Sequence, residues 1–111
     1  MEKEIIILNK PVKILLTKTE CGINVLITGG DFAHIGAVSV VGPQGEVCTK
    51  TFEGHKDNFV SVEWAEKLYK KFNVPVVVSV GIHYDNIDST GIDNVIAELK
   101  KALDAILTIK S

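Results

Sequence analysis

The three histidines of this chain lie in short polar segments between apolar runs, and each has an aspartate two or three positions away. The pairs are Asp31 with His34, His55 with Asp57, and His83 with Asp85. Imidazole and carboxylate groups exchange hydrogen bonds and protons, and both can ligate a metal ion. The three segments are therefore the candidate functional sites of the chain.

The first segment, GGDFAHIG at residues 29–36, is longer than the two-residue turn that suffices to join neighbouring strands. Gly29 and Gly30 suit a bend that needs positive φ angles, and they can also present backbone N–H groups to an anion. Asp31 and His34 follow them, and binding residues concentrate in such connections. We therefore expect these four residues to form one wall of a ligand site.

The second segment, EGHKDN at residues 53–58, supplies His55, Lys56 and Asp57 as candidate binding residues. The same residue types are common at the polar entry to a helix, where Asp57 or Asn58 would act as the N-cap. Either interpretation places the segment at the surface.

The third segment, GIHYDNIDSTG at residues 81–91, supplies His83, Asp85 and Asn86 as candidates. It also fits an ordinary turn, in which Asp85 and Asn86 would bond to their own backbone. The sequence alone does not separate the binding interpretation from the turn.

The spacing of these residues argues against the common catalytic motifs. Three histidines with carboxylates are an adequate ligand set for zinc or iron, but no H-x-x-x-H or C-x-x-C pair is present. Nucleophile-elbow and glycine-rich phosphate-loop motifs are also missing. We therefore expect a small binding protein with a polar, histidine-containing site, no catalysis of its own and no metal needed for folding.

Composition excludes several further classes. With 111 residues, 46% of them hydrophobic, and a net charge of -2, the chain suits one domain over residues 1–111 and neither disorder nor nucleic-acid binding. Its apolar runs fall short of the roughly 18 residues that cross a bilayer, and its start does not resemble a secretory signal. We expect a cytoplasmic protein with no membrane partner, in which Cys21 and Cys48 are buried, reduced thiols.

Hydrophobic periodicity predicts an α+β fold, an antiparallel sheet of about five or six strands carrying two helices. In the first half, β-branched runs and turn signals predict an antiparallel meander. Its strands are expected at residues 4–8, 11–19, 22–28, 35–41 and 46–52.

The second half is predicted to alternate helix, strand and helix. An apolar stripe from Val62 to Phe72 has helical spacing, and the continuous apolar run at residues 75–82 predicts a central strand covered on both faces. Thr90, with Asp93 in the first turn, is the expected N-cap of the final helix.

Three stretches together resemble the LpdD-like family, small proteins associated with UbiD-type decarboxylases and regarded as chaperones for reduced prenylated flavin mononucleotide (FMN). The resemblance covers about residues 12–107, and its motifs are TGGDFAHIGAVSV, FEGHKDNFVSVEWAEKL and VVVSVGIHYDNIDSTGIDNVIAELKKAL. It implies a fold like that of the proteasome-assembly chaperones and a homodimer. It further implies a non-enzymatic carrier that takes reduced prenylated FMN from a flavin prenyltransferase and passes it to a UbiD-type decarboxylase.

The resemblance also implies roles for the candidate residues. The glycine amides and Lys56 would bind the phosphate. The aspartate and asparagine side chains would bind the ribityl chain, and the histidines would donate to the ring carbonyls. Two alternatives stay open, a dimeric protein-assembly chaperone without a cofactor and a small metal-binding enzyme that uses the three histidines.

Overall fold

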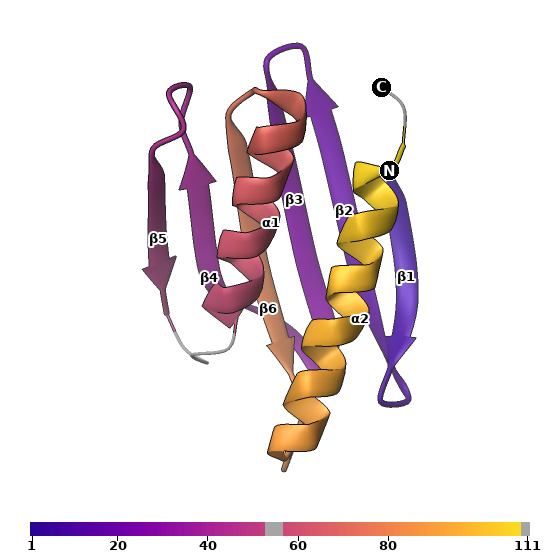
Figure 1. Ribbon diagram of the computed structural model, residues 1–111. Coiled ribbons are helices and arrows are strands. Elements are labelled where there is room, and N and C mark those ends of the chain that lie inside the picture. Colours follow the sequence, from indigo (N-terminus) through magenta and orange to yellow (C-terminus); the bar gives the residue numbers. More distant parts are fainter. Residues whose placement is uncertain (53–56, 110–111) are drawn as a thin grey trace.

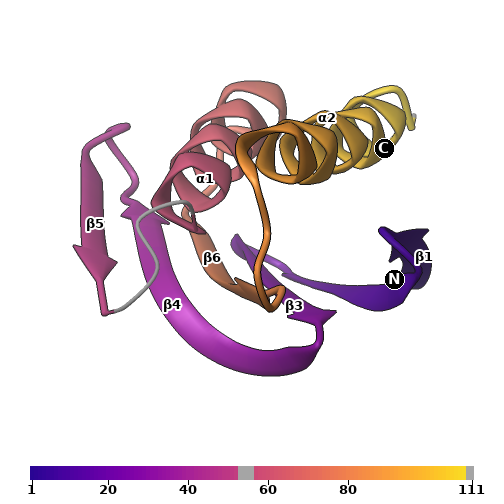
Figure 2. The ribbon, with the colours of Figure 1, turned by 90° about the horizontal axis from the view of Figure 1, so that it is seen from below.

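The structure, a computed structural model, describes residues 1–52 and 57–109. These residues form a six-stranded sheet with both helices packed on one face (Figures 1 and 2). In chain order the elements are β1 Glu2–Ile7, β2 Lys10–Thr19, β3 Gly22–Gly30, β4 Phe32–Val41, β5 Val47–Thr51, α1 Asp57–Phe72, β6 Val76–His83 and α2 Ser89–Leu107. The predicted α+β class, with its mostly antiparallel sheet and two helices, is confirmed.

The strand order is β1-β2-β3-β6-β4-β5, so the sheet is mixed. The predicted meander holds for β1 to β3 and for β4 with β5, but it is wrong between β3 and β4. There β6 is inserted, parallel to β3 and antiparallel to β4. The central place expected for residues 75–82 is confirmed. The expectation that both faces of this strand are covered is wrong, because both helices lie on one face of the sheet (Figure 2) and the outward side chains of Val77 and Ser79 are only half-buried.

The helices supply the large side chains of the core. Trp64 and Leu68 of α1, with Leu99 and Leu103 of α2, are almost completely buried against the inward residues of the sheet. This is the hydrophobic burial that the apolar stripes predicted. Neither helix of the described chain is long and apolar enough to cross a membrane.

Helix α2 begins earlier than its sequence signal suggested. Its N-cap is Asp88, which has extended backbone angles and whose Oδ1 accepts a 2.7 Å hydrogen bond from the N–H of Gly91. Thr90 therefore lies inside the first turn and Asp93 beyond it. The prediction of Thr90 was wrong because Asp88, two residues earlier, already caps the helix by accepting from the first-turn N–H of Gly91.

Both cysteines are exposed, contrary to expectation. Cys21 lies in the turn between β2 and β3, and Cys48 lies on the edge strand β5, all of whose residues are exposed. Apolar neighbours in the sequence did not lead to burial, because Cys21 lies in a turn and Cys48 is in register with the exposed Val40, on the sheet face opposite the helices.

Candidate functional site

The connection between β3 and β4 is a reversal with a single residue between the strands, not the long loop expected from the sequence. Asp31 alone separates the two strands, and the chain follows a broad curve past the end of β6 (Figure 2). Gly29 and Gly30 have φ angles of 153° and 86°, and a Cβ on Gly30 would lie 2.2 Å from the carbonyl oxygen of His83. The bend interpretation of the two glycines thus has a direct structural basis.

This reversal brings the first and third segments together. The N–H of Asp31 donates to the carbonyl oxygen of His83 at 2.7 Å, and Phe32 of β4 is in register with His83 of β6. The two segments therefore form one continuous surface at the end of β6.

His34 lies in a β-bulge of β4. Ala33 pairs with Ile82, and Ala37 pairs with Val80. Between these two pairs β4 contains more residues than β6 does. Opposite the bulge, a Cβ on Gly81 would lie 1.6 Å from the carbonyl oxygen of His34. The absence of a side chain at Gly81 therefore allows the bulge that positions His34. The candidates chosen from the sequence left out this glycine.

His34 faces the buried carboxyl group of Asp57, the first residue of α1. His34 Nε2 lies 3.5 Å from Asp57 Oδ2, and the Asp57 side chain is 7% exposed. Asp57 Oδ1 accepts a 3.3 Å hydrogen bond from the N–H of Ile82. Burial raises the pKa of Asp57 to about 6, although this hydrogen bond and the nearby histidines oppose the rise. Within the described chain, His34 Nδ1 and Asp57 Oδ2 are buried without a hydrogen-bond partner.

His83 belongs to a second, more exposed set of polar contacts. Its Nε2 lies 2.9 Å from Asp85 Oδ1, while the N–H of Asp85 donates to Asp31 Oδ2 at 2.7 Å. Lys10 Nζ lies 3.5 Å from Asp31 Oδ1. The hydrogen bond from the N–H of Asp85 lowers the pKa of Asp31, and Lys10 lowers it further by a smaller amount. Asp31 therefore ties the β3–β4 reversal to the loop that follows β6.

An exposed aromatic surface adjoins the histidines. The ring of Phe32, a residue that is 54% exposed, stacks on His83 with centroids 4.4 Å apart and planes 29° apart. Phe32 also lies 5.6 Å from His34, whose ring is 6.4 Å from that of His83. The selection of candidates from the sequence omitted Phe32. Its place between Asp31 and His34 was the available signal.

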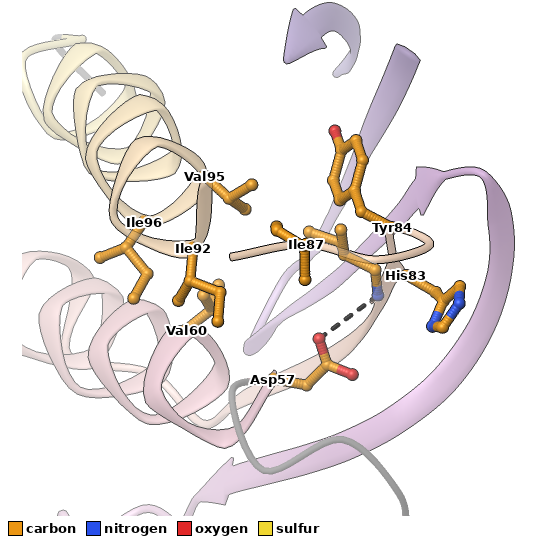
Figure 3. Close-up of a pocket in the computed structure, with 9 residues that line it drawn as sticks. Asp57, Val60, His83, Tyr84, Ile87, Ile92, Val95 and Ile96 are labelled. Carbon is orange, nitrogen blue, oxygen red and sulfur yellow. Dashed lines mark hydrogen bonds between the residues drawn. The ribbon is translucent and has the colours of Figure 1, made fainter. Parts of the chain in front are cut away.

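A mostly apolar pocket of about 200 Å³ opens beside Asp57 (Figure 3). It lies between the end of β6, the start of α1 and the start of α2. Its lining residues are Asp57, Val60, Ile82, His83, Tyr84, Ile87, Ile92, Val95 and Ile96. The Tyr84 hydroxyl points away to donate to the carbonyl oxygen of Ile7 at 2.6 Å, and burial raises the pKa of Tyr84.

The structure thus combines the predicted residues in a new way. His34 pairs with Asp57 rather than with Asp31, its neighbour in the sequence, and His83 pairs with Asp85 as the sequence order suggested. Asn86 is exposed with a φ of 56°, which supports the turn interpretation for that residue. His55 and Lys56 lie outside the described residues.

The described side chains do not form a metal-ligand cluster. Among them, no three His, Cys, Asp or Glu groups are placed to hold one ion. What the site offers instead is an exposed aromatic face, imidazole and carboxylate groups and an apolar pocket. These features are those of a binding site for a partly planar, partly apolar ligand.

Comparison with solved structures assigns the fold to a class. The chain is similar to a chain in the "Crystal Structure of a Novel Chaperone Complex for Yeast 20S Proteasome Assembly", with a TM-score of 0.63 and 14% sequence identity over 97% of this chain and 94% of that one. The fold is therefore similar to that found in this proteasome-assembly chaperone complex. No curated protein matches the sequence.

The family follows from the sequence match. Residues 8–111 match the prenylated flavin chaperone LpdD-like domain, which covers nearly the whole chain. The protein belongs to this chaperone family, and the resemblance found in its three motifs is confirmed.

Proposed function

We propose that this protein is a non-enzymatic carrier that binds reduced prenylated FMN and delivers it to a UbiD-type decarboxylase. Membership of a prenylated flavin chaperone family supports this function. The observation that carries it is the convergence of the Phe32–His83 stack, the His34–Asp57 pair and the apolar pocket at the end of β6.

The chemistry of the ligand suits these groups. A flavin ring presents a flat aromatic face, which can lie on the exposed Phe32 ring, and an edge of carbonyl and nitrogen groups. His34 Nδ1 and Asp57 Oδ2 have no hydrogen-bond partner in the described chain, although Oδ2 lies 3.5 Å from His34 Nε2, and the polar edge of a ligand would satisfy them. Their buried position makes such a bond worth more than one at the surface.

The proposed binding residues are those selected from the sequence, with Phe32 added from the structure. In this assignment the Lys56 ammonium group binds the phosphate, because its positive charge attracts the phosphate oxygens. The full set is Gly29, Gly30, Asp31, His34, His55, Lys56, Asp57, His83, Asp85 and Asn86, together with Phe32.

Selectivity for the reduced cofactor follows from its shape and hydrogen bonding. A reduced flavin ring is bent and carries more donor and charge character than the oxidised ring. A preorganised set of carboxylate and neutral imidazole groups distinguishes the two states by differential hydrogen bonding. The protein would thereby hold the cofactor in the form in which a flavin prenyltransferase releases it.

We also propose a homodimer that acts in the cytoplasm. The sheet face opposite the helices carries exposed Leu15 and Val40 beside half-buried Leu26 and Val77, and an apolar sheet face of this kind favours association. Cys21 and Cys48 are free thiols, as is usual in a reducing compartment.

Anaerobic titration with reduced prenylated FMN tests the carrier function. We expect binding by the wild type and an affinity lower by roughly ten- to a hundredfold in His34→Ala and in His83→Ala, because each change removes a polar partner. Asn94→Ala, an exposed change on α2, serves as control. No binding by the folded wild type would reject the carrier and favour a protein-assembly chaperone. Unchanged binding in both histidine variants would move the site elsewhere.

Delivery requires a separate measurement. The loaded protein is mixed with an apo-decarboxylase of the UbiD type, and recovery of decarboxylase activity is compared with that from free reduced cofactor. We expect more complete recovery from the carrier after exposure to air. Equal recovery would show that the protein binds the cofactor without protecting or delivering it.

A further inference from the structure

The pocket beside Asp57 is too small for a whole flavin. Its volume is about 200 Å³, whereas sites for complete small-molecule ligands usually occupy roughly 300–1,000 Å³. An occupant of this pocket is therefore one part of a ligand whose remainder lies outside it.

The wall of the pocket selects the chemistry of that part. Val60 of α1 lies near Ile92, Val95 and Ile96 of α2, and Ile87 lies beside them on the side toward Tyr84 (Figure 3). These side chains offer no hydrogen bonds. A ribityl hydroxyl, a phosphate or a ring carbonyl placed among them would lose its water without gaining a partner. A branched hydrocarbon would lose no hydrogen bonds to water there, and its burial would remove apolar surface from water.

The polar groups of the wall are already engaged or lie at its margin. The Tyr84 hydroxyl is bonded to the carbonyl oxygen of Ile7, and Asp57 uses Oδ1 to accept from the N–H of Ile82. Asp57 Oδ2, which faces His34, is the polar atom of these two residues left for a ligand in the described chain. The pocket is thus apolar inside, with one carboxylate oxygen toward the histidines.

The pocket adjoins the proposed flavin site. His83 is among the residues that line the pocket, and its ring, which points away from the apolar side chains of the pocket (Figure 3), stacks on Phe32 just outside it. Asp57 lines the pocket and faces His34. A ligand with a planar ring at the histidines and a branched apolar group attached to that ring would use both regions at once.

We propose that this pocket receives the isoprenoid-derived part of the prenylated flavin and so selects prenylated FMN over plain FMN. The proposal rests on the carrier function proposed above. It assigns cofactor selectivity to Val60, Ile87, Ile92, Val95 and Ile96, none of which was among the candidate binding residues chosen from the sequence.

Filling the pocket provides the test. Ile96 is half-buried, so Ile96→Phe places a larger side chain at the pocket with little disturbance of the core. Ile92→Asn instead adds a polar group to the wall without filling it. Leu107→Phe is the matched control, because Leu107 is also half-buried on α2 but lies outside the pocket lining.

The affinities for reduced prenylated FMN and for reduced plain FMN are measured anaerobically for all four proteins, each checked for folding by its melting temperature. We expect Ile96→Phe and Ile92→Asn to weaken binding of prenylated FMN by about tenfold or more and to leave that of plain FMN within about twofold. The Leu107→Phe control should match the wild type for both.

The possible outcomes separate the two proposals. If both pocket variants bind prenylated FMN as the wild type does, or lose affinity equally for both flavins, the pocket does not hold the isoprenoid group and the inference is wrong while the carrier function stands. If the wild type binds neither flavin, the carrier function itself is wrong. Should one pocket variant fail to fold, the other still decides, because the two changes alter the pocket in different ways.

Discussion

His34 Nε2 lies 3.5 Å from Asp57 Oδ2, although His34 lies on β4 and Asp57 is the first residue of α1. The contact joins a half-buried imidazole to a carboxyl group that is nearly inaccessible to water. It depends on the bulge in β4 and on the missing side chain at Gly81. The stability and the binding properties of the protein should therefore respond to changes at each of these positions.

Gly81→Ala should strongly destabilise the protein. The new Cβ would overlap the carbonyl oxygen of His34, and backbone on both strands would have to move. We expect a loss of about 3 kcal/mol or more in the free energy of unfolding, measured by urea denaturation. Gly22→Ala is the control, because its Cβ would approach the flexible Thr19 hydroxyl at 3.3 Å, and it should cost less than about 1 kcal/mol. Equal effects of the two changes would contradict this account of the bulge.

Asp57→Asn should remove a pH dependence of stability. The folded pKa of about 6 exceeds the ordinary 3.8, so between these values the folded state binds more protons than the unfolded state, and the free energy of unfolding falls as pH rises. Above pH 6 the ionised Asp57 costs up to about 3 kcal/mol, which the asparagine would relieve while still accepting from the N–H of Ile82.

Urea denaturation from about pH 4 to about pH 8 measures this effect. Asp93→Asn, at an exposed aspartate on α2, should keep the slope of the wild type. If the stability of Asp57→Asn falls across this interval as steeply as that of the wild type, Asp57 does not titrate as described.

Phe32→Ala should weaken flavin binding without weakening the fold. The ring is largely exposed and stacks on His83, so its loss removes a binding face rather than core packing. We expect the binding free energy of reduced prenylated FMN to fall by about 0.5–1.5 kcal/mol with an unchanged melting temperature. Phe52→Ala removes a phenylalanine of similar exposure that lies near Lys50, and should bind normally. A normal affinity in Phe32→Ala would remove this ring from the site.

Leu26→Lys should convert the proposed homodimer to a monomer. Leu26 lies on the sheet face opposite the helices, in register with Leu15, and a lysine there would place charge in the interface. Light scattering at micromolar concentration measures the mass. Asn94→Lys adds the same charge on exposed α2 and should leave the dimer intact. A wild type with the mass of a monomer would refute the homodimer.

Chelation should not change stability. His34 and His83 each face a different aspartate, and the described residues hold no cluster suited to a metal ion. We therefore expect the same melting temperature with and without EDTA. A decrease of many degrees on adding EDTA would instead support the metal-binding alternative.

The sequence by itself determined the elements and the class of fold. Runs rich in β-branched residues became strands, and the apolar stripes ending at Phe72 and Leu107 became the two helices, because these patterns depend on local backbone preference and on one buried face. The apolar run at 75–82 also indicated a central strand, because continuous apolar runs are typical of strands in the interior of a sheet. The sequence motifs further indicated the family that the match over residues 8–111 confirms.

Only the tertiary structure decided how these elements combine. Insertion of β6 between β3 and β4 brought His34 next to Asp57 and placed Gly81 against the backbone of His34, where a side chain would not fit. Packing of α1 and α2 on the same face of the sheet formed the apolar pocket. Local patterns carry no information on such relationships, because strand order and pocket shape follow from packing between segments far apart in the chain. The exposure of Cys48 has the same origin, since it depends on β5 being an edge strand that pairs with β4 alone and places Cys48 in register with the exposed Val40.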